Sequence, residues 1–312
     1  MNIIKKLNVF QINFRMVVLG DYPVPPGRVI LITGGTKGIG LETAKKLARG
    51  RAELILTTRN SGVLENGEEQ RRFLSEFPIP TKIHILKLDL NSLSAVKKFC
   101  SEVKQRFPRL DCIVCNAGTM QKNGGKTADG WEVHFGVNYL AHFQLIQLLS
   151  PTLQDSQDPR IILVSSSHLT KGRINFETLK NGEPSRSSRG VTQEYCDSKL
   201  MMALWGYQLQ KYLNNIKIIT VSPGWCRTGL GREHGTPWVI LPFIIIPLAL
   251  FSQSAEEGAD SVVYCILKST LASPVFIKNR KSVPAIQRYL EENDRLGSEL
   301  WDFSISAIEE HK

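Results

Sequence analysis

A tyrosine and a lysine lie one helical turn apart in the run YCDSK, at Tyr195 and Lys199. If residues 194–213 form a helix, the two side chains share one face. A phenol with an unperturbed pKa of about 10 is a poor acid or base at neutral pH, but an adjacent ammonium lowers that pKa. The pair could then exchange a proton with a carbonyl or hydroxyl oxygen. Because Tyr–Lys pairs are also common by chance on exposed helices, the meaning of this one depends on the surrounding elements.

A glycine-rich turn is the second chemical feature of the chain. The stretch TGGTKGIG, residues 33–40, follows an apolar run and opens a helical pattern. Glycines let the backbone turn sharply and let a pyrophosphate approach it, and the N–H groups at a helix start favour an anion. The spacing is not the common G-x-G-x-x-G, so the strand before and the helix after carry the prediction of a nucleotide site. Its candidate residues are Gly34, Lys37, Gly38, Ile39 and Gly40.

The end of the second predicted strand indicates which nicotinamide cofactor is preferred. An NAD-selective site usually carries an acid there, which bonds the ribose 2′-hydroxyl. This sequence has TTRN at 57–60 instead, so Arg59 can pair with a 2′-phosphate, and Lys37 can reach the same group from the glycine turn. Each side chain alone is common as a solvated charge. Together they predict NADP(H).

Strand-like and helix-like segments alternate along the chain. The apolar, β-branched runs expected to be strands are 28–33, 53–58, 82–88, 111–115, 160–166 and 216–221. Helical patterns lie between them at 39–49, 68–77, 92–107, 129–149 and 194–213, with Asn91 or Ser92 and the pair Ser254 and Glu257 as capping candidates. This alternation predicts an α/β fold, a single-domain Rossmann-type doubly wound parallel sheet with helices on both faces. Ligands bind such a sheet at the carboxyl ends of its strands.

Charge and cysteine usage limit the kinds of partner. The 312 residues carry a formal net charge of +10, but the Lys and Arg residues are dispersed, which argues against nucleic acid and fits an anionic cofactor or an acidic membrane surface. The six Cys show no disulfide-framework spacing and indicate reduced thiols. Cys112 and Cys115 form a C-x-x-C inside an apolar run, which predicts a buried strand rather than a redox pair. No zinc-type spacing is present, so no metal is expected.

Two apolar segments could approach a membrane. Residues 1–20 place apolar side chains at helical spacing, which fits either an amphipathic helix on a membrane or a helix docked on the protein's own core. The segment PWVILPFIIIPLALF, residues 237–251, is interrupted by prolines and shorter than the ~20 residues that a spanning helix needs. We interpret it as an apolar flap over a pocket.

Beyond these features, the chain resembles the short-chain dehydrogenase/reductase family over about residues 27–280. The motifs that carry the resemblance are TGGTKGIG at 33–40, DL at 89–90, CNAG at 115–118, VNYLAHF at 137–143, LVSSS at 163–167, YCDSK at 195–199 and SPGWCRT at 222–228. The runs DGWEVHFGVNYLAHF and FSQSAEEGADSVVYCIL are most similar to the retinol dehydrogenase group, particularly its dehydrogenase/reductase X-linked type. Members of that group act on long apolar alcohols and aldehydes such as retinoids and polyprenoids.

The resemblance implies a catalytic set of Tyr195, Lys199, Ser166 and Asn138. Tyr195 is expected to be the proton donor and acceptor, and Lys199 to lower its pKa and bond the nicotinamide ribose. Ser166 is expected to hold the substrate oxygen, although its neighbours Ser165 and Ser167 leave an error of one residue open. Asn138 is expected to connect the lysine with solvent through a water.

The resemblance also implies the rest of the cofactor site. Asp89 is expected to accept from the adenine amino group, and Leu90 to line that pocket. Asn116, Ala117 and Gly118 are expected to pass under the adenosine. Pro223, Gly224 and Thr228 are expected to cradle the nicotinamide end.

These features predict an NADP(H)-dependent oxidoreductase that interconverts a hydrophobic alcohol, of the retinoid or polyprenoid kind, and its aldehyde or ketone. One alternative is a steroid or small xenobiotic carbonyl as substrate. The other is a catalytically idle nucleotide-binding protein that acts through partners, but such proteins often lose the catalytic set that is intact here.

The expected organisation is an N-terminal segment 1–26, a catalytic domain 27–280 that includes the flap 237–251, and a C-terminal helical extension 281–312. The expected location is the cytosolic side of the endoplasmic reticulum or a lipid droplet, with the cytoplasm as the alternative. Peripheral membrane contact and a homodimer are both left open by the sequence.

Overall fold

The computed structural model describes residues 25–59, 66–77, 81–121, 124–181, 191–224, 226 and 253–310. The segment 1–20 and the flap predicted at 237–251 both lie outside these residues, so their predicted contacts with a membrane or a pocket stay predictions. Within the described residues no helix has both the length and the apolar content to cross a bilayer.

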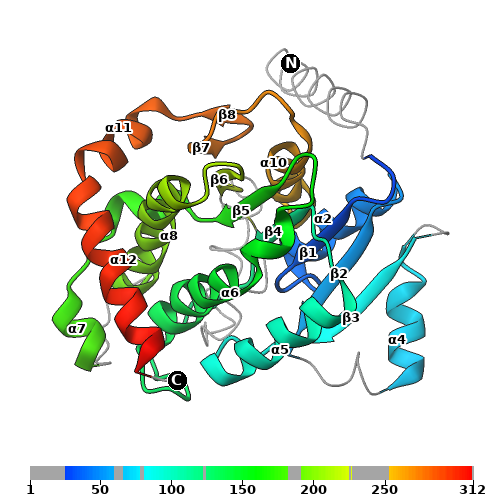
Figure 1. Ribbon diagram of the computed structural model, residues 1–312, viewed down its shortest axis with the longest axis horizontal. Coiled ribbons are helices and arrows are strands. Elements are labelled where there is room, and N and C mark those ends of the chain that lie inside the picture. Colours follow the sequence, from blue (N-terminus) through cyan, green and yellow to red (C-terminus); the bar gives the residue numbers. More distant parts are fainter. Residues whose placement is uncertain are drawn as a thin grey trace, which may run out of the picture.

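One eight-stranded sheet forms the centre of the molecule (Figure 1). Its strands are β1 Val29–Ile32, β2 Glu53–Thr58, β3 Ile83–Lys87, β4 Cys112–Cys115, β5 Arg160–Val164, β6 Lys217–Ser222, β7 Val275–Lys278 and β8 Lys281–Ser282. They are ordered β3-β2-β1-β4-β5-β6-β7-β8, and every pair is parallel except β7 with β8. The predicted parallel sheet is therefore confirmed, with the order reversing at β1, which pairs with both β2 and β4.

The strands are buried on both faces, which explains their nearly continuous apolar sequences. In β1, Leu31 faces one apolar core, while its neighbours Ile30 and Ile32 face the other. Helices cover each face of the sheet. The helices on the core of Ile30 are α2 Gly38–Ala48, α4 Gly67–Leu74 and α10 Ala255–Leu267. The helices on the core of Leu31 are α5 Leu93–Arg106, α6 Ala141–Leu149, α8 Gln193–Tyr212, α11 Pro284–Glu292 and α12 Asp294–Glu309. The run of Cys112 and Cys115 is the buried strand β4, and both thiols are free, as predicted.

Polar side chains fix where these helices begin. Ser92 accepts from the N–H of Ala95 and caps α5, which decides between the two predicted capping residues. Ser254 and Glu257 form the predicted capping box of α10, with bonds of 2.7 and 3.1 Å. Thr192 caps α8 by accepting from the N–H of Tyr195, so a side-chain bond holds the helix start at the tyrosine itself.

The helix predicted at 129–149 begins later than expected, and this part of the prediction was wrong. Gly130 has φ of +85°, and the backbone closes a tight turn there instead of a helix. The Glu132 carboxylate then accepts from the N–H groups of His134 and Phe135, which starts the helical region. A π-helical turn, η1 Phe135–Leu140, precedes α6. Such turns are frequent at functional sites, and this one carries Asn138.

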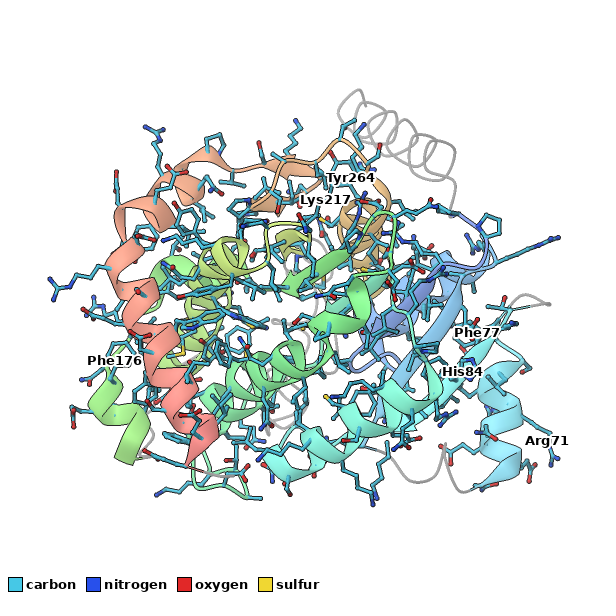
Figure 2. The ribbon with its side chains drawn as sticks, viewed as in Figure 1. Arg71, Phe77, His84, Phe176, Lys217 and Tyr264 are labelled. Atoms are coloured by element: carbon cyan, nitrogen blue, oxygen red, sulfur yellow. The ribbon has the colours of Figure 1, made fainter. Side chains whose placement is uncertain are left out.

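Helix α12 covers the outer surface of α6 and α8 (Figure 1). Its Trp301 ring lies 5.1 Å from the ring of Phe143 on α6, and its Ser304 hydroxyl lies 2.8 Å from the hydroxyl of Tyr139. The short helix α7 Phe176–Asn181 packs against the same stretch of α12, where the rings of Phe176 and Phe303 are 5.2 Å apart (Figure 2). Helix α8 is thus held between the sheet and α12.

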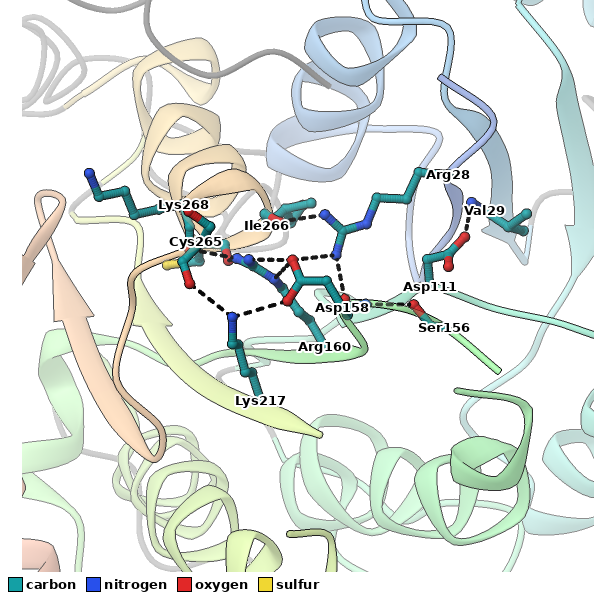
Figure 3. A network of polar contacts seen from close by, with 11 residues as sticks. Arg28, Val29, Asp111, Ser156, Asp158, Arg160, Lys217, Cys265, Ile266 and Lys268 are labelled. Atoms are coloured by element: carbon teal, nitrogen blue, oxygen red, sulfur yellow. Dashed lines mark hydrogen bonds and ion pairs between the residues drawn. The ribbon is translucent and has the colours of Figure 1, made fainter. Parts of the chain in front are cut away.

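A charged network closes the amino ends of β1, β5 and β6 (Figure 3). Arg160 is fully buried and donates to the carbonyl oxygens of Cys265 and Lys268 at 2.8 and 2.9 Å, at the end of α10. It also binds the Asp158 carboxylate at 2.6 Å, and Lys217 reaches the other oxygen of that group at 3.1 Å. Burial opposes ionisation of Asp158, but the hydrogen bonds and charges of Arg160 and Lys217 outweigh it and lower the pKa of the carboxyl. This network lies at the opposite edge of the sheet from the carboxyl strand ends.

Candidate active site

The glycine turn forms a close-packed cradle at the carboxyl end of β1. Gly34 and Gly38 have φ of +65° and +56°, which favour glycine. A Cβ on Gly40 would lie 2.4 Å from the Gly34 oxygen and 2.6 Å from Asn116 Nδ2, so no side chain fits there. Helix α2 starts at this turn with no side-chain cap and no acid in its first turn. A bare, positive helix start beside a glycine cradle fits the diphosphate of a dinucleotide.

Thr33 ties this turn to the end of β4. Its hydroxyl oxygen accepts from the N–H groups of Asn116 at 2.9 Å and Ala117 at 3.0 Å. The Asn116 amide in turn donates to the Thr33 carbonyl at 2.8 Å. Two segments that the sequence assigned to the cofactor are therefore brought together, through a threonine that sequence reasoning did not single out.

The remaining cofactor candidates lie along the same edge of the sheet. Arg59 directly follows β2, Asp89 follows the neighbouring β3, and Lys37 precedes α2. Arg59 and Lys37 are exposed, whereas Leu90 is buried. Pro223 and Gly224 follow β6, where Gly224 has φ of +90°. Thr228 lies outside the described residues.

The proposed catalytic pair lies on the inner face of α8. Tyr195 and Lys199 are 8% and 5% exposed, and the lysine Nζ is 5.6 Å from the centre of the tyrosine ring. The ammonium donates to the Val164 carbonyl at 3.0 Å, at the end of β5. Burial lowers the pKa of Lys199 to about 8. At neutral pH the lysine is therefore mainly charged, and the free energy needed to deprotonate it is small because its pKa is about 8.

The pKa of Tyr195 differs from the sequence prediction. Burial raises it to about 12, and hydrogen bonding with Ser166 opposes this only in part. The net lowering expected from the nearby Lys199 is not found, because that argument left out the burial of the phenol. Tyr195 is thus neutral at pH 7 and holds the proton that a carbonyl oxygen would need.

Asn138 is held in place by three hydrogen bonds of its side chain. Its Oδ1 accepts from the N–H of Thr119 at 2.7 Å, and its Nδ2 donates to the Thr119 carbonyl and to Ser198 Oγ, both at 3.0 Å. Ser198 passes the contact on by donating to the Tyr195 carbonyl at 2.8 Å. The Asn138 amide is thereby connected to the backbone of α8 at Tyr195.

Gly118 lies between Asn138 and Lys199. A Cβ at this glycine would be 3.1 Å from Asn138 Oδ1 and 3.7 Å from Lys199 Nζ. The predicted relay partners therefore approach the same small space, and a larger residue at 118 would compete with them for it.

The three serines after β5 have different partners. Ser165 donates to the Lys199 carbonyl at 2.7 Å, and Ser167 bonds Ser222 Oγ at 3.2 Å. Ser166 is the one whose side chain lowers the pKa of Tyr195, against the larger effect of burial. The geometry therefore favours Ser166 as the serine that meets a substrate oxygen.

A buried histidine connects the two halves of the site. His142 Nε2 is 2.9 Å from the Thr33 hydroxyl, and its Nδ1 is 3.1 Å from the Asn138 carbonyl. Complete burial lowers its pKa to about 4, which keeps the ring neutral. Since Nδ1 faces a carbonyl, it carries the proton and donates, and Nε2 accepts from Thr33. Its place one helical turn after Asn138, in VNYLAHF, was the available signal, but the partner Thr33 is distant in sequence.

We expect His142 to make the fold sensitive to acid. Its pKa is about 4 in the folded chain and near 6.5 when unfolded, so the unfolded chain binds the extra proton more readily. The contribution is complete above pH ~6.5 and is lost progressively as the pH falls toward 4, by up to about 3 kcal/mol. Denaturant unfolding at a series of pH values should show a shallower slope in His142→Asn.

Comparison with known proteins agrees with this geometry. A family model described as short chain dehydrogenase matches residues 28–178. Retinol dehydrogenase 14 of Homo sapiens is 33% identical, with 91% of this chain and 87% of the relative covered. Polyprenol dehydrogenase of Homo sapiens is 30% identical, with 91% and 86% covered.

Solved structures share the fold. A crystal structure of an uncharacterized protein from Mycobacterium Paratuberculosis matches with a TM-score of 0.70 and 26% identity, covering 93% of this chain and 96% of that one. The NADPH-dependent 3-quinuclidinone reductase from Rhodotorula Rubra matches with a TM-score of 0.62 and 20% identity, covering 81% and 90%.

Proposed function

The chain belongs to the short-chain dehydrogenase/reductase family, and on that premise we propose that it is an NADP(H)-dependent oxidoreductase interconverting a hydrophobic alcohol and its aldehyde or ketone. The observation that carries the proposal is the meeting of Tyr195, Ser166, Lys199 and Asn138 at the carboxyl strand ends, next to the glycine cradle. Sites of this kind in doubly wound sheets bind their ligands at that edge.

The chain offers contacts for each part of the cofactor. The start of α2 with Gly34, Gly38 and Gly40 fits the diphosphate, since Gly34 and Gly38 have positive φ and a Cβ on Gly40 would meet the Gly34 carbonyl oxygen. Lys37 and Arg59 would hold the 2′-phosphate, and Asp89 and Leu90 the adenine. Asn116, Ala117 and Gly118 would pass under the adenosine, and the nicotinamide end would fall to Pro223, Gly224 and Thr228, together with Tyr195 and Lys199. When bound, NADP(H) supplies or accepts the hydride.

The side chains then handle the proton. In the reductive direction the neutral Tyr195 phenol donates to the substrate oxygen, which Ser166 holds by a second hydrogen bond. The charged Lys199 stabilises the phenolate that this donation leaves. Asn138, fixed beside Gly118, connects the lysine with the proton supply. Oxidation of an alcohol uses the same contacts in reverse.

We expect the double variant Lys37→Ala, Arg59→Ala to lose its preference for NADPH. Each charge-assisted bond to a 2′-phosphate contributes roughly tenfold or more to binding, and NADH has no such phosphate. The KM for NADPH should therefore rise by about 10- to 100-fold, while the KM for NADH changes little. Arg106→Ala removes an exposed charge from α5, outside the site, and should alter neither value. An equal loss with both cofactors would contradict the assignment.

The substrate class is proposed from the relatives and from the sequence of the flap. Two of the relatives are named for retinol and for polyprenol, both long apolar alcohols. The test is NADPH consumption by purified protein in detergent with retinal, a short polyprenal, a keto-steroid and a small aromatic aldehyde. Turnover that favours a long isoprenoid supports the proposal, whereas preference for the steroid or the small aldehyde supports the rival substrate class. Tight NADPH binding with no turnover would indicate the idle nucleotide-binding protein.

We also propose that the chain meets lipid at the cytosolic face of the endoplasmic reticulum or a lipid droplet, through residues 1–20 and 237–251. The support is the apolar sequence of both segments. Release from membranes by high salt or high pH would fit a peripheral protein. Recovery in the cytosolic fraction would contradict the proposed location.

A further inference from the structure

His168 lies beside both proposed reacting hydroxyls and has no role in the proposed mechanism. It follows Ser166 by two residues, in the short helix η3 Ser167–Lys171. Its Nδ1 is 3.2 Å from Ser166 Oγ, and its backbone N–H donates to the same oxygen at 3.3 Å. Its ring centre is 6.3 Å from that of Tyr195, in an edge-on arrangement.

The effect of His168 depends on which ring nitrogen carries the proton. Burial, helped by the charge of Lys171, lowers the pKa of this histidine, so the ring is neutral and has one donor and one acceptor. If Nδ1 carries the hydrogen, Ser166 Oγ accepts twice from His168, and its own hydrogen is left for another partner. If Nδ1 is bare, the Ser166 hydrogen points at His168 and cannot be donated to a substrate.

The proposed function distinguishes the two arrangements. A carbonyl oxygen carries no hydrogen, so Ser166 can hold the substrate oxygen only by donating its own hydrogen to it. The backbone N–H of His168 already occupies one lone pair of Ser166 Oγ, and Nδ1 lies within hydrogen-bonding distance of the same oxygen. Ser166 can therefore donate to the substrate only if Nδ1 of His168 gives a hydrogen instead of accepting one.

We propose that His168, protonated at Nδ1, is a positioning residue that occupies both lone pairs of Ser166 and fixes its hydroxyl as a donor toward the substrate oxygen. The proposal rests on the proposed function, in which Ser166 holds that oxygen. His168 acts through Ser166 and does not itself touch the reacting atoms.

The first experiment needs no substrate. Long-range ¹⁵N–¹H correlation spectra of the full chain at neutral pH identify the protonated nitrogen of each histidine, and His168→Asn identifies which signals belong to His168. Protonation at Nδ1 is expected. Protonation at Nε2, with Nδ1 bare, would overturn the proposal whatever the enzyme turns over.

The second experiment compares variants that replace the Nδ1 donor in different ways. The Nδ2 group of Asn can take the place of Nδ1–H, so His168→Asn should keep kcat within about threefold of wild type. His168→Leu removes the donor and should lower kcat by about tenfold with little change in KM or NADPH affinity. His168→Asp offers an acceptor alone, which attracts the Ser166 hydrogen, and should be the slowest of the three.

Controls separate this role from a structural one and from failure of the proposed function. Thermal unfolding should differ little among the three variants, since the side chain is only half-buried, and His84→Asn should match wild type in kcat. An Asp variant as fast as the Asn variant would overturn the proposal. If wild type turns over no offered substrate, the proposed function fails, while the spectra still decide the direction of the hydrogen bond.

Discussion

Replacing Tyr195 by Phe should lower NADPH-dependent turnover by about 10²- to 10⁴-fold, the usual contribution of a positioned acid or base. In the proposed function the phenol is the neutral proton donor, and burial raises its pKa to about 12. No other described side chain is placed to donate the proton instead, because Ser166 is a far weaker acid and Lys199 donates to the Val164 carbonyl. The measurement is kcat with the best aldehyde found for the wild type.

The same variant should fold and bind cofactor normally. The Phe ring keeps the edge-on packing that Tyr195 makes with His134 and His168, at 6.4 and 6.3 Å. NADPH affinity, followed by quenching of tryptophan fluorescence, should therefore change little. Tyr207→Phe, on the same helix but outside the site, is the matched control and should retain full activity. Undiminished turnover in Tyr195→Phe would refute the catalytic assignment.

Replacing Arg160 by Met should destabilise the fold by about 2–4 kcal/mol, the cost of leaving the carbonyl oxygens of Cys265 and Lys268 without their donor. The guanidinium is fully buried and joins two carbonyls at the end of α10 to the Asp158 carboxylate (Figure 3). Without it, those oxygens lose their donors and Asp158 loses its nearest cation. Denaturant unfolding at pH 7 measures the loss.

A neighbouring lysine provides the control for this variant. Lys217 contacts the same carboxylate but is about one-third exposed, so Lys217→Met should destabilise by less than about 1 kcal/mol. The folded fraction of Arg160→Met should retain the wild-type kcat, because Arg160 begins β5 whereas Ser166 follows its far end. If the two variants lost similar amounts of unfolding free energy, the burial of Arg160 would not explain its contribution to stability.

The alternating pattern of the sequence predicted the fold well because the inner strands are buried on both faces and most helices bury one face. The periodicities that burial imposes are local, so they can be read without knowing the partners. The start of the helix after Gly130 could not be read in this way. It depends on a positive φ at Gly130 and on the carboxylate of Glu132 meeting the N–H groups of His134 and Phe135.

The candidate site likewise has a part that could be predicted from local sequence and a part that could not. Motif spacing brought Tyr195, Ser166 and the glycine turn to one edge of the sheet, and the structure places them there. The pKa of Tyr195 was predicted in the wrong direction because burial is a property of the whole fold and not of a pair. Thr33 and His142 were missed because their bond joins positions far apart in sequence. The roles of all these residues, and the division of the chain at residues 26 and 280, stay predictions.

The covering of α8 by α12 has a consequence for synthesis on the ribosome. All eight strands of the sheet precede α12 in the chain, so they leave the exit tunnel first and the sheet can begin to form before α12 has emerged. Until then the apolar surface around Phe143, Tyr139 and Trp205 has no cover from Trp301. The nascent chain therefore passes through a stage in which α8 is present but its outer apolar surface is exposed. Chaperones that recognise exposed aromatic groups should bind the chain at that stage. A stop codon between residues 283 and 294 would make that stage permanent, yielding a chain with every proposed catalytic residue but a strong tendency to aggregate.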